Sequence, residues 1–98
     1  VDGIDIIYIG SNDLLIEMGM PGQFDSEVLE KAAKRVIDAA LSNGKFAGVG
    51  GIRGAEMAEK YVRLGSQFLT THSDLAFMME AASARAKLLR GAAARAKG

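Results

Sequence analysis

Short apolar segments alternate along the chain with longer amphipathic ones. The first apolar run covers residues 4–9 and ends at Gly10, and two more cover residues 46–49 and 68–71. Runs of this length, rich in β-branched and aromatic residues, are typical of strands buried on both faces of a parallel sheet. The hydrophobic pattern therefore predicts three short strands.

The segments between and after these runs have helical periodicity. Helices are expected from Asp25 or Ser26 to the Asn43-Gly44 stop, over residues 55–64, and from Ser73 or Asp74 to about Arg90. The first has apolar residues at three- and four-residue spacing: Val28, Leu29, Ala32, Val36, Ala39 and Ala40. The inward side of the second is expected to hold Met57, Ala58, Tyr61 and Val62. Residues 91–98 are expected to be frayed.

The repeated strand–helix order predicts an α/β fold. A strand followed by a helix, three times over, indicates a parallel sheet with right-handed crossovers. A parallel sheet needs cover on both faces, and three strands make a poor closed domain. The 98 residues are thus expected to form part of one larger α/β domain.

Composition excludes several classes of protein. Twelve basic and twelve acidic residues cancel, so no global field favours nucleic acid. The absence of cysteine excludes a disulfide framework, a thiolate metal site and cysteine catalysis. No apolar run approaches the roughly 20 residues that span a bilayer. The composition predicts a cytoplasmic protein with no nucleic-acid or membrane partner.

Residues 10–13, Gly-Ser-Asn-Asp, follow the first predicted strand. Loops at the carboxyl edge of an α/β sheet commonly carry the chemistry. The backbone amides of Ser11 and Asn12 can point toward an anion, and Asp13 offers a hard oxygen ligand for Mg²⁺ or Mn²⁺. The same three residues can instead cap a short helical turn over residues 14–18. Spacing alone leaves both interpretations open.

Two other segments carry weaker signals. Residues 48–54 partly match a dinucleotide-binding fingerprint, but the third glycine is displaced and no acid follows at the expected distance. A tight turn with Arg53 at the mouth of a cleft is the favoured interpretation, and a phosphate- or nucleotide-binding module is an alternative. His72 could serve as a general base, although a hydrogen-bonded loop histidine is favoured.

Residues 1–14 resemble the segment V-D-G-hydrophobic-F-I-G-P-x-D-L near the end of HpcH/HpaI-type aldolases. Shorter matches follow at turns and strand ends: Met18-Gly19, Pro21-Gly22, Gly65 before Phe68, and Ser73-Asp74 after Thr71. The family comprises metal-dependent class II pyruvate aldolases, related to the citrate lyase β chain, with a (β/α)8 TIM barrel. The resemblance implies that this chain holds the last three strand–helix units of that barrel.

The same resemblance implies a function. It points to reversible aldol cleavage of 2-keto acids such as pyruvate, with an aldehyde as the other partner and Mg²⁺, Mn²⁺ or Co²⁺ stabilising the enolate. Asp13 matches a metal ligand, and the amides of Ser11 and Asn12 match the binding site for the keto-acid carboxylate. Ser11 stands in place of the family's proline, and Asn12 in place of a small residue.

The family's other functional residues have no counterpart here. Its metal-binding glutamate, substrate-binding arginine and catalytic histidine all precede this segment, so no catalytic residue is assigned. The isolated chain is expected to be inactive. An alternative is a catalytically incomplete, self-associating half-barrel-like module.

Helix exchange supports the expectation of a homo-oligomer. Relatives in the family exchange their last helix between subunits, and here that helix carries side chains that would need burial: Leu75, Phe77, Met78, Met79, Leu88 and Leu89. The chain starts at Val1 and enters strand-like sequence at once, so both a fragment and a self-standing chain are considered.

Overall fold

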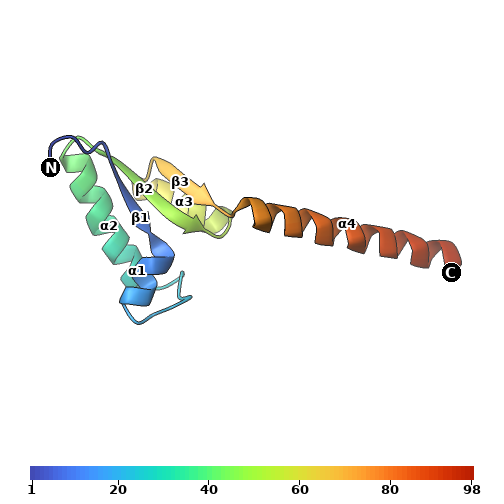
Figure 1. The fold of residues 1–98 in the computed structure, drawn as a ribbon. Helices are drawn as coiled ribbons and strands as arrows, with labels where there is room; N and C mark the ends of the chain where they lie inside the picture. Colours follow the sequence, from blue (N-terminus) through green and yellow to red (C-terminus); the bar gives the residue numbers. More distant parts are fainter.

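The computed structural model describes residues 1–98 and contains one parallel sheet and four helices (Figure 1). In chain order the elements are β1 (Ile6–Gly10), α1 (Ser11–Glu17), α2 (Glu27–Ser42), β2 (Phe46–Ile52), α3 (Ala55–Arg63), β3 (Phe68–Thr71) and α4 (Asp74–Lys97). The strands lie in the order β1-β2-β3, with each neighbouring pair parallel. The predicted α/β fold with three strand–helix units is confirmed.

The two faces of the sheet have different neighbours. Ile9, Ala47 and Val49 point toward the helices and belong to the buried core, because successive side chains of a strand alternate between faces. The other face has no helix over it and is called the inner face below. Its large side chains are about half exposed: Ile6, Tyr8, Phe46 and Phe68.

The core lies between the sheet and the helices α2 and α3. Leu29, Ala33, Ile37 and Ala40 are the buried residues of α2, and Met57 and Tyr61 are those of α3. The predicted stripe was right at Leu29 and Ala40 but wrong at Val28, which is 49% exposed, and at Ala39, which is also exposed. Because α2 has pairs of neighbouring alanines, its sequence does not define which of two adjacent faces is buried. Packing of the helix against the sheet decides this. Val62, expected to point inward from α3, is also exposed.

Several predicted boundaries shift in the structure. β1 begins at Ile6, the first residue that pairs with β2, rather than at Ile4. β2 continues to Ile52 through Gly50 and Gly51, with a bulge after Val49, where a turn was expected. The start of α2 agrees with the prediction, since the Ser26 hydroxyl accepts a hydrogen bond from the Leu29 amide at 3.2 Å.

Helix α4 leaves the end of β3 and extends away from the other elements (Figure 1). It begins at the predicted place, because the Ser73 hydroxyl accepts a hydrogen bond from the Ala76 amide. The helix continues to Lys97, so residues 91–97, expected to be frayed, are helical. The many alanines of this segment have the highest helix propensity and explain the continuation. None of its residues is buried.

The extended shape follows from this arrangement. The molecule measures 65 × 28 × 22 Å, and only 15 of its 98 residues are buried, so much apolar surface has no partner within the chain. All six large apolar residues of α4 that were expected to need burial are exposed: Leu75, Phe77, Met78, Met79, Leu88 and Leu89. None of the helices combines the length and apolar character needed to cross a membrane.

Candidate functional site

The carboxyl ends of the three strands meet at one edge of the sheet, because all three are parallel. Residues 11–13 follow β1, Arg53 follows β2, and His72 follows β3. The structure thus places the three segments singled out from the sequence at the same edge. The three segments differ in whether their side chains are free for a ligand or already contact other residues of the chain.

Residues 11–13 form the first turn of α1 rather than a cap preceding it. Gly10 is the N-cap residue and α1 begins at Ser11, so the predicted helical turn starts earlier than expected. No side chain caps this helix, and the Asp13 carboxylate forms none of the ion pairs of the chain. Asn12 and Asp13 are exposed. Their polar groups are therefore available to a ligand.

Ser11, in contrast, is buried, with a side chain engaged inside the fold. Its hydroxyl donates a hydrogen bond of 2.6 Å to the carbonyl of Gly50. Gly51 has a φ of +74°, and a Cβ at this position would lie 2.5 Å from the Ser11 hydroxyl oxygen. Only the backbone amide of Ser11 is left for a ligand, which is the group that the sequence argument used.

Two glycines that are partners in the sheet leave space on the inner face, next to the first turn of α1, for the side chains of two other residues. Gly10 and Gly50 are partners in the β1–β2 ladder. A Cβ at Gly10 would lie 3.3 Å from Oδ2 of Asp13, and a Cβ at Gly50 would overlap the hydroxyl of Tyr8. The Asp13 carboxylate and the Tyr8 phenol therefore occupy neighbouring positions, since adjacent strands are about 4.8 Å apart.

The Tyr8 hydroxyl lies 2.7 Å from Oγ1 of Thr70, so the phenol spans β2 from β1 to β3. Its ring packs edge-on against Phe68, with centroids 6.1 Å apart. Neither Tyr8 nor Thr70 was a candidate site residue from the sequence alone. The period-two alternation that puts Tyr8 and Gly10 on one face was a usable signal, but the contact between β1 and β3 depends on the sheet order.

Arg53 and His72 contact other parts of the chain. The Arg53 guanidinium lies over the Phe24 ring, 4.3 Å from its centroid. His72 Nε2 lies 3.2 Å from Oε2 of Glu80, and its ring packs edge-on against Phe77. His72 is thus the loop histidine with a polar partner that was favoured. Its φ of 54° is the one positive value at a non-glycine residue.

The predicted glycine-rich turn of residues 48–54 lies largely inside β2. A Cβ at Gly48 would meet Phe68, one at Gly50 would meet Tyr8, and one at Gly51 would meet Ser11. These glycines make room for side chains of the chain itself. That packing accounts for them without a phosphate group.

As a metal site, the chain contributes a single carboxylate. No group of three or more histidine, cysteine, aspartate or glutamate residues is placed to hold a metal ion. The Asp13 carboxylate nevertheless suits a hard divalent cation, because it is exposed and free of other partners. Further ligands would have to come from outside these residues.

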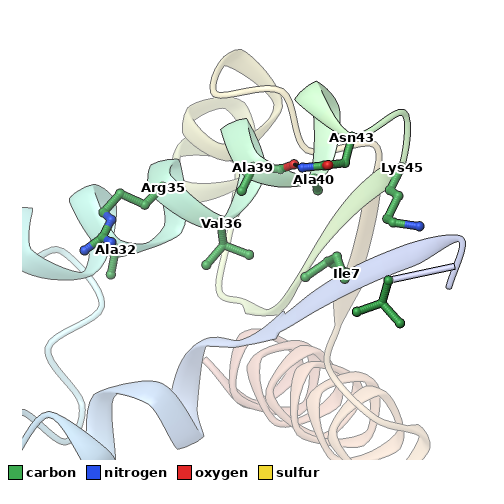
Figure 2. Close-up of a pocket in the computed structure, with 9 residues that line it drawn as sticks. Ile7, Ala32, Arg35, Val36, Ala39, Ala40, Asn43 and Lys45 are labelled. Atoms are coloured by element: carbon green, nitrogen blue, oxygen red, sulfur yellow. Dashed lines mark hydrogen bonds between the residues drawn. The ribbon is translucent and has the colours of Figure 1, made fainter.

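A separate groove of about 590 Å³ lies on the helix side of the sheet (Figure 2). Figure 2 shows Val36 and Ala39 of α2 above Ile7 of β1, with Lys45 at one end. Six of its nine lining residues are hydrophobic, and none is acidic or a histidine. The groove therefore offers packing surface rather than catalytic groups, and it is not the site at the sheet edge.

Comparison with known proteins gives a consistent set of relatives. No family model matches the chain. The chain is 32% identical over 84 residues to a hydroxypyruvate/pyruvate aldolase of Delftia acidovorans, covering 86% of this chain and 31% of the relative. It is 30% identical over 86 residues to a 4-hydroxy-2-oxo-heptane-1,7-dioate aldolase of Escherichia coli, and the match covers 88% of this chain and 32% of that relative.

A solved structure adds the fold. The chain superposes on an HpcH/HpaI aldolase from Desulfitobacterium hafniense with a TM-score of 0.80 at 24% identity, covering 92% of this chain and 35% of that one. This chain is similar to HpcH/HpaI-type aldolases. The likeness confirms the sequence-based resemblance and identifies the fold as part of a TIM barrel. The chain spans about a third of the length of the aldolases it matches.

Proposed function

We propose that this chain is the C-terminal part of a divalent-metal-dependent aldolase that forms and cleaves carbon–carbon bonds of 2-keto acids. The observation that carries the proposal is the free Asp13 carboxylate at the carboxyl edge of the sheet, in a chain whose relatives are named aldolases. Catalytic groups of TIM-barrel enzymes lie at this edge.

Three residues have assigned roles in the proposal. Asp13 would be one ligand of a divalent cation, which when bound would supply Lewis acidity to the keto acid. The amides of Ser11 and Asn12 bind the keto-acid carboxylate, since N–H groups in the first turn of a helix have no carbonyl partner within it. The Ser11–Gly50 hydrogen bond holds these amides and Asp13 in place.

The substrate class follows from the names of the relatives. One is named a hydroxypyruvate/pyruvate aldolase and another a 4-hydroxy-2-oxo-heptane-1,7-dioate aldolase. For the second compound, cleavage breaks the bond between C3 and C4, leaving pyruvate and an aldehyde. We propose a 2-keto acid with a hydroxyl on C4 as the substrate, and pyruvate plus an aldehyde as the products.

The test uses the complete open reading frame that encodes these residues. Pyruvate release from 4-hydroxy-2-oxo-heptane-1,7-dioate is measured before and after treatment with EDTA, and again after addition of Mg²⁺, Mn²⁺ or Co²⁺. Loss of pyruvate release with EDTA and recovery with a metal would support the proposal. A folded protein that releases no pyruvate with any of the three metals would overturn it.

Self-association is a second proposal, favoured by the wholly exposed α4. Its large apolar side chains are exposed, including Met78 and Leu89. We propose that the last helix is exchanged between copies in a homo-oligomer. Light scattering of the complete protein would show a defined oligomer that dissociates when α4 is deleted, whereas a monomeric complete protein would contradict the proposal.

A further inference from the structure

We propose that the hydroxyl pair of Tyr8 and Thr70 binds the oxygen of the aldehyde partner, the atom that becomes the C4 hydroxyl of the condensation product. This inference rests on the proposed aldolase function. It adds a binding element on the inner face, separate from the metal-ligand turn.

The geometry places the pair beside the metal ligand. The Tyr8 hydroxyl lies over Gly50, and the Asp13 carboxylate lies over Gly10, its ladder partner. Asp13 would therefore hold the keto-acid side of the reaction, and the hydroxyl pair lies one strand further along the sheet. That position suits the second substrate, which has to lie next to the keto acid for a carbon–carbon bond to form between them.

The pair also has a hydrogen atom to donate. A tyrosine and a threonine hydroxyl each carry one proton and can both donate and accept. Their mutual bond of 2.7 Å uses one of the two protons, whichever residue donates. The second O–H is left to donate to an aldehyde carbonyl oxygen. Both side chains are exposed in this chain, and Tyr8 and Thr70 lie two residues and one residue before the carboxyl ends of their strands, the edge where barrel enzymes bind their substrates.

Neighbouring residues position the phenol. Gly50 has no side chain to displace it, and the Phe68 ring packs edge-on against it. Tyr8 can therefore reach Thr70 across β2 in one conformation. The pair binds and orients; it is not assigned a proton-transfer step.

The experiment measures condensation of pyruvate with glycolaldehyde and with succinic semialdehyde, using the complete protein. Tyr8→Phe keeps the ring and removes the hydroxyl, and Thr70→Val keeps the shape and removes Oγ1. The double variant Tyr8→Phe/Thr70→Val has no hydroxyl left and is expected to raise the KM for the aldehyde about three- to tenfold, the effect of one lost neutral hydrogen bond. Each single variant keeps one O–H and should raise this KM less. The KM for pyruvate should stay within about twofold.

Two control variants separate this role from a structural one. Thr70→Ser keeps the hydroxyl and should retain the wild-type KM for the aldehyde. Tyr61→Phe removes a phenol hydroxyl from the core and should leave both KM values unchanged. If the double variant Tyr8→Phe/Thr70→Val leaves the aldehyde KM of an active enzyme unchanged, or raises the pyruvate KM instead, this inference is overturned alone. An inactive wild-type protein would overturn the proposed function and this inference with it.

Discussion

The Ser11 hydroxyl donates a buried hydrogen bond of 2.6 Å to the Gly50 carbonyl and so joins the ends of β1 and β2. Ser11 is also the first residue of α1, two positions before Asp13. The bond therefore connects the sheet directly to the turn that carries the metal-ligand candidate. It gives the backbone carbonyl of Gly50, a buried residue, a side-chain hydrogen-bond partner.

Ser11→Ala is expected to lower the free energy of unfolding by about 1–3 kcal/mol, because a buried hydrogen bond to the Gly50 carbonyl is lost. Urea unfolding of the complete protein measures this change. Ser42→Ala is the matched control, since the Ser42 hydroxyl donates to the Ala39 carbonyl at an exposed position. The control should stay within about 0.5 kcal/mol. Equal costs for the two variants would contradict the role given to the Ser11 bond.

Gly50→Ala is expected to destabilise the protein by about 1–3 kcal/mol through overpacking. The added methyl group would overlap the Tyr8 hydroxyl and force the phenol away from Thr70. Removing the phenol with Tyr8→Ala should reduce the cost of Gly50→Ala, and a double-mutant cycle by urea unfolding measures that coupling.

Gly54→Ala is the control for this experiment. Its backbone is extended, and a Cβ there would have no neighbour within 4 Å. Because Gly54 is the N-cap of α3, alanine there should cost up to about 1 kcal/mol through the weaker cap, and this cost should be the same with and without Tyr8→Ala. Additive effects of Gly50→Ala and Tyr8→Ala would show that the two residues do not compete for the same space.

Tyr61 makes stability depend on pH at the alkaline end. Burial raises the pKa of Tyr61 above its ordinary value of 10.0, and the nearby Glu30 carboxylate raises it further. The unfolded chain then loses this proton at a lower pH than the folded protein does. The free energy of unfolding should fall as the pH rises above about 10. The fall should end once the pH exceeds the raised pKa of Tyr61 in the folded protein.

Tyr61→Phe tests this dependence, because phenylalanine keeps the ring in the core and has no ionisable group. Unfolding curves of both proteins between pH 8 and pH 11 should show a steeper alkaline loss for wild type. Glu30→Gln should move the onset of deprotonation in folded wild type to lower pH. Parallel pH profiles for wild type and Tyr61→Phe would rule out a raised pKa.

Asp13→Asn is expected to weaken Mn²⁺ binding to the complete protein by at least about tenfold, because an amide oxygen replaces a charged ligand. Loss of a partner in the outer shell of a metal site already costs 10–100-fold in affinity. Isothermal titration measures the change. Glu17→Gln removes an equal charge from the same short helix, outside the turn, and should leave affinity within about twofold. Unchanged affinity of Asp13→Asn would remove Asp13 from the metal site.

Much of the architecture was predictable from local patterns. Phe68–Thr71 is a strand over the predicted residues, and α2 begins after the predicted Ser26 cap. Hydrophobic periodicity and capping residues act over a few positions, so they can be read from the sequence. Asp13 was singled out for the same kind of reason, as a carboxylate just after an apolar strand.

Which side chains meet was decided by the tertiary structure. Tyr8 and Thr70 are 62 positions apart, and they meet because β1 and β3 lie on either side of β2 with glycine between them. The choice of Ile37 over Val28 as a core residue likewise came from how α2 packs on the sheet. Local sequence determines the elements and the edge that carries polar groups. Strand order and register determine the partners, because contacts between distant residues depend on how the elements are placed together.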